Sequence, residues 1–73
     1  TITTQTKSIT PEKAQQIALK ESKSGTVIGF EQDTYFGKVV YEVKILDGQT
    51  EKEYKIDAQT GAVVEQETDS VND

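Results

Sequence analysis

Hydrophobic and polar residues follow two different periods along this chain. Between residues 9 and 22 apolar side chains recur at the spacing of a helix face, and beyond residue 26 they alternate with polar ones. The first period is typical of an amphipathic helix, and the second is typical of strands that bury one face. The pattern therefore predicts one helix followed by an antiparallel sheet with one wet side.

The predicted helix covers the stretch ITPEKAQQIALKES, from Ile9 to Ser22. Thr10 is a favourable N-cap, and Pro11 suits the first helical position because its missing N–H would have no partner there. Gly25 provides a natural stop. The face predicted to meet the sheet carries mostly small side chains, which favour close packing, at Ala14, Ile17, Ala18 and Glu21.

Four strands are predicted after the helix, over residues 26–32, 38–46, 50–57 and 62–67, with Asp47-Gly48 as a hairpin signal between the second and third. Laying the helix across the apolar face of a four-stranded antiparallel meander buries both apolar surfaces at once. We therefore expect an α+β fold in one domain that spans residues 9–67. Residues 1–8 are interpreted as a linker or frayed N-terminus, and residues 68–73 as a disordered acidic tail.

The composition removes most catalytic chemistry. Among 73 residues there is no Cys and no His, so a disulfide, a thiolate metal site and a Ser-His-Asp triad are all excluded. Two weaker arrangements remain, a serine beside a lysine and a pair of carboxylates on a flat sheet face. The members of both are solvated in the predicted fold: Ser22 or Ser24 with Lys20 or Lys23, Glu51 with Glu53, and Glu65 with Glu67. We therefore expect no enzyme and no cofactor.

The charge is negative and unevenly distributed. The net charge is −5, and the part up to Leu46 holds six lysines and five acids, whereas the shorter part from Asp47 holds two lysines and eight acids. This balance disfavours nucleic acid and an anionic membrane surface as partners, and no apolar run is long enough for a membrane helix. The acidic part from Asp47 indicates a solvated face that aids solubility or, alternatively, a surface for a basic partner.

The segment Asp57 to Gly61, DAQTG, allows two interpretations. Calcium could use Asp57, the backbone of this turn and Glu51, but the spacing of an EF-hand loop is absent, so we expect no metal. The favoured interpretation is a structural turn in which Asp57 accepts hydrogen bonds from backbone N–H groups and Gly61 supplies a positive φ. Thr60 completes the turn motif.

Tyr35 and Phe36 are the candidate partner-binding residues. They lie in the predicted loop Asp33 to Gly37, where two adjacent aromatic residues cannot easily both face the core. An exposed aromatic side chain is a candidate anchor for a protein partner. The alternative is that Phe36 folds over the open end of the core while Tyr35 lies on the surface. A meander also leaves its first and last strands able to pair with an extended peptide, unless Glu65 and Glu67 blunt the last one.

Three stretches together resemble the PepSY domain family. The helix ITPEKAQQIALKES is similar to the opening helix of that family, VVYEVKI to its central strand, and YKIDAQTGAVVE to its closing hairpin. The resemblance implies a helix on an antiparallel sheet in a bacterial extracytoplasmic protein, and a role in restraining peptidases. It brings no catalytic residues, so the matching Asp57, Thr60 and Gly61 carry over as structure only. The bulky loop TYF departs from the short polar turn that is usual in the family.

These observations lead to two functional hypotheses. The first is a non-enzymatic extracytoplasmic binding module that modulates or inhibits a peptidase, so its partner is a protein. The second is a structural spacer or interaction domain within a multidomain bacterial cell-surface protein. The chain begins without Met and has no signal-peptide stretch, so we also expect an excised domain or a processed product.

Overall fold

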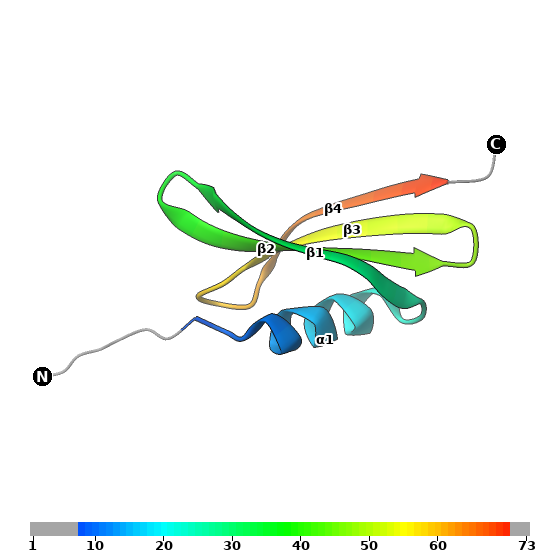
Figure 1. The fold of residues 1–73 in the computed structure, drawn as a ribbon, viewed down its shortest axis with the longest axis horizontal. Helices are drawn as coiled ribbons and strands as arrows, with labels where there is room; N and C mark the ends of the chain where they lie inside the picture. The colour runs from blue at the N-terminus through cyan, green and yellow to red at the C-terminus, as the bar shows by residue number, and fades with distance from the viewer. Residues whose placement is uncertain (1–7, 71–73) are drawn as a thin grey trace, which may run out of the picture.

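The computed structural model describes residues 8–70 and shows one helix on one face of a four-stranded sheet (Figure 1). The elements follow in the order α1 (Pro11–Ser22), β1 (Thr26–Tyr35), β2 (Lys38–Asp47), β3 (Thr50–Asp57) and β4 (Val63–Ser70). Each strand pairs antiparallel with the next, so the sheet order is β1-β2-β3-β4. The predicted α+β fold, with a helix packed on an antiparallel meander, is confirmed.

The helix begins where its cap predicts. The Oγ1 atom of Thr10 accepts the N–H of Lys13 at 3.1 Å, and Pro11 is the first helical residue. The helix ends at Ser22 because Lys23 adopts a left-handed backbone, with φ of 76°, and donates its N–H to the carbonyl of Leu19. The stop therefore lies two residues before Gly25, which instead makes the connection to β1.

The core lies between α1 and the inner face of the sheet, which is the face that the helix covers. Ala14 and Ala18 are fully buried there against side chains of β2 and β3, chiefly Val43, Ile45, Tyr54 and Ile56. The prediction that Glu21 shares this face is wrong: Glu21 is exposed, and Ser22 is buried instead. Ala14, Ala18 and Ser22 are four residues apart, so they form one line along the helix, and this line faces the sheet.

β2 ends one residue later than the sequence predicts, and two other strands extend further. β1 continues to Tyr35 because Asp33, Thr34 and Tyr35 pair with β2, and a two-residue turn replaces the expected five-residue loop. β4 continues to Ser70, so residues 68–70 are not part of a disordered tail: they pair with residues 50–52 of β3. The other residues of the predicted linker and tail, 1–7 and 71–73, lie outside the described residues.

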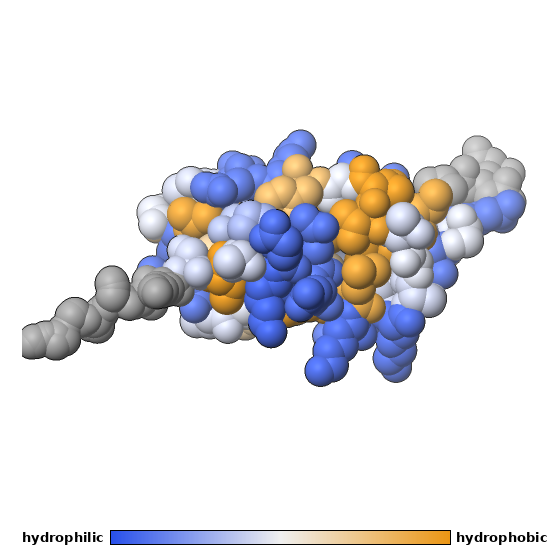
Figure 2. Space-filling model, turned by 60° about the horizontal axis from the view of Figure 1, so that its bottom comes forward, coloured by the Kyte–Doolittle hydropathy of each residue, from blue (hydrophilic) through white to orange (hydrophobic). Residues whose placement is uncertain are grey.

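The two sides of the molecule differ in what covers them. Figure 2 shows the side that carries α1, where hydrophilic residues cover the middle and a band of hydrophobic residues lies next to them. α1 itself exposes polar residues, among them Glu12, Lys13, Gln16 and Lys20. The opposite side is the outer face of the sheet, and no helix or strand of the described residues packs on it (Figure 1).

Candidate functional site

The turn between β1 and β2 presents an aromatic side chain entirely to solvent. Its two central residues, Phe36 and Gly37, have φ of 51° and 78°, as the tight hairpin turns require. Phe36 is 103% exposed, and Tyr35 is 39% exposed. The alternative in which Phe36 covers the open end of the core is therefore wrong. A two-residue turn holds Phe36 beyond the end of the sheet, where it cannot reach the core.

Tyr35 lies on the outer face and contacts a lysine two strands away. The Nζ atom of Lys55, on β3, is 5.2 Å from the centroid of the Tyr35 ring, and it also lies 3.5 Å from a carboxylate oxygen of Glu65. The hydrogen bond to Tyr35 and the charge of Glu65 both raise the pKa of Lys55. Val40, on the intervening strand, is only 7% exposed although it belongs to the outer face. Tyr35 is therefore linked to β3 through Lys55, across the intervening strand.

A groove of about 310 Å³ lies on the outer face next to these residues. Gly29 of β1 has no side chain, and the groove opens beside it between an apolar wall at Ile28 and a set of charged residues. These charged residues come from three strands: Glu31, Glu42, Lys44 and Glu53. A β-bulge between Val27 and Gly29 makes Ile28 an extra residue in β1, and Ile28 is 48% exposed.

Two acids of the groove, Glu42 and Glu53, interact directly. A hydrogen bond with Glu53, the burial of the carboxyl group and the charge of Glu53 raise the pKa of Glu42 from 4.5 to about 7. Lys55 opposes this shift and Glu31 adds to it. A cation beside these two groups would lower the pKa of Glu42 and favour the ionised form of both.

Carboxylates also stand directly opposite one another on neighbouring strands of this face. The register pairs Glu31 with Glu42, Glu53 with Glu67, and Glu51 with Asp69. Like charges in such positions destabilise a sheet, although Lys44 and Lys55 lie on the same face and offset part of the repulsion. The sequence placed Glu51 with Glu53, and Glu65 with Glu67, on flat solvated surfaces. It gave no sign that Glu42 and Glu53 meet in a groove; Gly29 within a strand was the one available signal.

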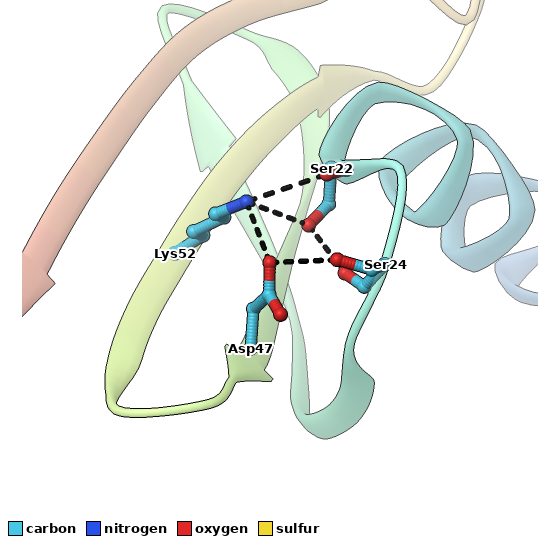
Figure 3. A network of polar contacts seen from close by, with 4 residues as sticks. All are labelled: Ser22, Ser24, Asp47 and Lys52. Carbon is cyan, nitrogen blue, oxygen red and sulfur yellow. Dashed lines mark hydrogen bonds and ion pairs between the residues drawn. The ribbon is translucent and has the colours of Figure 1, made fainter.

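A second polar cluster lies on the opposite side of the sheet, at the end of α1 (Figure 3). The Nζ atom of Lys52 donates to the carbonyl and the Oγ atom of Ser22, at 3.3 and 3.2 Å, and pairs with the Asp47 carboxylate at 3.1 Å. Ser24 donates its hydroxyl to the same carboxylate, and both contacts lower the pKa of Asp47. Ser22 therefore faces Lys52, not the Lys20 or Lys23 considered from the sequence. The cluster joins the helix end to the β2–β3 hairpin, and its lysine is neutralised by Asp47.

The sequence itself places this fold in a known group. Residues 8–67 match the family described as peptidase propeptide and YPEB domain, PepSY. The chain belongs to the PepSY family. The resemblance inferred from its helix, central strand and closing hairpin is thereby confirmed.

Several proteins are similar to this PepSY domain. It is 33% identical over 69 residues to the uncharacterized protein Spy1430 of Streptococcus pyogenes, covering 89% of this chain and 53% of that protein. It is 42% identical over 62 residues to the uncharacterized protein YkoJ of Bacillus subtilis, covering 84% of this chain and 36% of that protein. The chain thus spans about half or less of the length of these curated relatives.

A solved structure has the same fold. The crystal structure of a "putative lipoprotein (CD1622)" from Clostridium difficile 630 superposes with a TM-score of 0.78 at 31% identity. The match covers 85% of this chain and 40% of that one. The helix-on-meander arrangement of the PepSY domain is therefore found in an experimental structure as part of a longer chain.

The DAQTG segment forms a closed turn in this PepSY domain. The Asp57 carboxylate accepts the N–H groups of Gln59 and Thr60 at 2.8 and 3.3 Å, and the N–H of Gly61 donates to the Asp57 carbonyl. Gly61 has φ of 79°, and Thr60 Oγ1 accepts the N–H of Ala62. Glu51 lies six residues away on the same strand, roughly 20 Å at the usual rise per residue. The structure therefore does not bring together the calcium ligands considered from the sequence.

Among residues 8–70, no three acidic side chains are arranged to hold a metal ion. The single helix of this range is too short and too polar to cross a membrane.

Proposed function

We propose that this PepSY domain is a non-enzymatic, extracytoplasmic binding module that modulates or inhibits a peptidase. Membership of a family described by peptidase propeptides supports the class of partner. The similarity to a chain described as a putative lipoprotein supports a location outside the cytoplasm. The observation that carries a binding role is the fully exposed Phe36 on the β1–β2 turn.

Phe36 does nothing for the stability of the isolated domain. Its side chain makes no contact with the core, and its positive φ costs about 1–2 kcal/mol for a residue with a Cβ atom. Asn or Gly would form the same turn without that cost. Backbone strain that a fold does not need is typical of functional positions, and exposed aromatic residues are typical anchors of protein interfaces. We therefore assign Phe36, with the neighbouring Tyr35, to the contact with the partner.

The test is inhibition of peptidases from the secreted and cell-envelope fraction of the source bacterium. Purified domain at tens of micromolar should slow the cleavage of a casein substrate, and Phe36→Asn should remove most of this effect. Val64→Asn is the control because Val64 is an apolar residue, 57% exposed, on β4, which is the edge strand opposite β1. It should inhibit as wild type does.

Two results would contradict the proposal. If wild-type domain neither binds nor slows any peptidase in this fraction, the inhibitory function is wrong. If Phe36→Asn and Val64→Asn inhibit equally well while both are folded by circular dichroism, the turn is not the anchor.

The second candidate is a structural spacer or interaction domain of a multidomain bacterial cell-surface protein. One observation favours it: the chain covers only 36 to 53% of its curated relatives, so this unit occurs within longer proteins. This alternative is tested by capturing binding partners with the complete parent protein that contains the wild-type domain. Capture of partners that include no peptidase supports it.

A further inference from the structure

The outer face of the sheet combines three features that the fold does not require. No described helix or strand packs on it, it contains the groove beside Gly29, and its strands hold carboxylates opposite one another. We propose that this face docks a basic segment of a protein partner, and that one Lys or Arg side chain of that segment lies in the groove. This inference rests on the proposed function and specifies the chemistry of the partner.

The shape of the groove fits a long cationic side chain. Ile28 forms an apolar wall and is 48% exposed, and the missing side chain of Gly29 leaves the space beside it open. Lys and Arg have apolar stems that pack along such surfaces while their charged ends reach polar groups. The charged end would meet Glu31, Glu42 and Glu53, which line the same groove.

The charges of the outer face select a cation over other groups. Three carboxylates line the groove and only one lysine, Lys44, does so. A second lysine nearby, Lys55, already forms an ion pair with Glu65 and contacts the ring of Tyr35. A cation placed between Glu42 and Glu53 would attract both carboxylates and offset their mutual repulsion. An anionic partner, such as nucleic acid or an acidic lipid surface, would increase that repulsion.

The groove and Tyr35, which is next to the proposed anchor Phe36, share the outer face of the sheet. Tyr35 lies on the same face as the groove and reaches Lys55, whose β3 position is directly opposite Glu42. A partner segment that contacts Phe36 and follows this face therefore passes the three carboxylates. Complementary charge at such a rim speeds association and selects among partners.

The test uses two peptides, an acetylated and amidated hexapeptide of alternating Lys and Ala, and the same peptide with Glu in place of Lys. Amide shifts of the isotopically labelled wild-type chain are followed by NMR at about 0.02 M and about 0.15 M salt. The Lys peptide should produce saturable shifts centred on Gly29, Glu42 and Glu53, weaker at the higher salt. The Glu peptide should produce none.

Two variants separate the groove from the overall negative charge. Glu42→Gln/Glu53→Gln removes two carboxylates of the groove and should weaken binding of the Lys peptide about fivefold or more. Glu12→Gln/Glu21→Gln removes two exposed carboxylates of α1 and is the matched control, with a change of less than about twofold.

Gly29→Val tests the shape without any change of charge. A Cβ atom at Gly29 would lie 3.4 Å from the Cβ of Lys44, which is an ordinary contact, so the strand accommodates a side chain there. Valine suits a strand and fills the groove, so this variant should fold and still bind the Lys peptide about threefold or more weakly.

Four results would overturn the inference: no saturable shifts on the outer face, equal binding of both peptides, equal weakening by the two double variants, or unchanged binding by Gly29→Val. These outcomes differ from failure of the proposed function. If the Lys peptide does not bind but Phe36-dependent peptidase inhibition is intact, only the proposal of a basic partner segment is wrong. If the Lys peptide binds in the groove but no peptidase is bound or inhibited, only the proposal of a peptidase partner is wrong.

Discussion

The inner and outer faces of the sheet differ in whether their side chains stabilise the fold. On the inner face, Ile45 and Tyr54 are buried beneath α1, and among residues 8–70 no buried side-chain polar atom lacks a hydrogen-bond partner. On the outer face, Glu42 and Glu53 share a groove and carboxylates stand opposite one another. The inner face is thus arranged for stability, and the outer face contains repulsion that folding alone does not explain. Features that reduce stability are the better guide to function.

The two faces are nevertheless built by the same strands of the chain. β2 alternates between them, so Tyr41 and Val43 point to the helix while Glu42 and Lys44 lie outside. A slip of the register by one residue would exchange the two sets. The apolar residues of the inner face therefore fix the positions of the outer carboxylates, which is how an unfavourable arrangement persists.

The largest expected contrast comes from truncating one isoleucine on each face. Ile45→Ala leaves a cavity in the core and should reduce the free energy of unfolding by about 2–5 kcal/mol, close to the total of roughly 3–5 kcal/mol expected for a domain of this size. Ile28→Ala removes a half-exposed side chain from the groove wall and should cost about 1 kcal/mol or less. Urea unfolding followed by circular dichroism measures both. Equal losses would mean that the outer face is part of the core.

Two glycines sharpen the contrast. A Cβ atom at Gly25, where φ is 113°, would lie 2.6 Å from Cγ2 of Ile45 and 2.9 Å from the carbonyl oxygen of Leu46. Gly25→Ala should therefore destabilise the domain by about 2–4 kcal/mol through strain and overpacking. Gly29→Ala meets only an ordinary contact, so its free energy of unfolding should stay within about 0.5 kcal/mol of wild type or rise. Thermal unfolding of both variants measures the two changes in stability. A clearly destabilising Gly29→Ala would show that the groove is not open space.

Local patterns in the sequence predicted the inner face well. The helix bounds, the cap at Thr10 and the strand alternation through Val43 and Ile45 all depend on neighbouring residues, so a single sequence reveals them. Glu21 was wrongly placed on the inner face because helical spacing allows either Glu21 or Ser22 to continue the row of Ala14 and Ala18. Only the contact with the sheet shows that Ser22 continues it. The longer β4 was missed because its polar residues pair through backbone atoms, which leaves no hydrophobic pattern.

The outer face could not be predicted in the same way. Its groove joins Gly29, Glu42 and Glu53, and their meeting depends on a bulge at Ile28 and on the pairing of three strands. The contact of Lys52 with Ser22 likewise spans thirty residues of chain. The sequence allowed Phe36 to be either exposed or folded over the core, and the geometry of the turn shows that it is exposed.

The turn beside the outer face provides a third, smaller contrast. Phe36→Asn should raise the free energy of unfolding by about 1 kcal/mol, because Asn-Gly suits the positive φ of both turn positions better than Phe-Gly does. The same variant is expected to lose peptidase inhibition, so stability and binding would change in opposite directions. Urea midpoints give the stability, with Val64→Asn as the control. A less stable Phe36→Asn would mean that the aromatic ring supports the fold after all.

The smallest expected effect concerns pH and tests the repulsion itself. The pKa of Glu42 rises from 4.5 to about 7 on folding, so the folded domain binds a proton more tightly than the unfolded chain does. Glu42 therefore contributes stability that is fully present below pH 4.5 and is lost as the pH rises through about 7. The pKa shifts of Asp47 and Lys55 affect the free energy of unfolding in other pH ranges. The lowered pKa of Asp47 has its effect below pH 3.8, and the raised pKa of Lys55 has its effect above pH 10.5.

Urea midpoints measured from pH 5 to pH 8 at constant salt should fall for the wild-type domain. Because Glu42 is partly solvated, we expect a change of less than about 1 kcal/mol. Glu42→Gln cannot ionise, so its midpoints should change less over this range and exceed those of wild type at pH 8. Glu21→Gln removes an equal charge from the helix and should keep the wild-type slope, which separates the groove from the net charge. Parallel slopes for all three proteins would mean that Glu42 and Glu53 do not interact in solution. Without that interaction, the outer face would be an ordinary solvated surface.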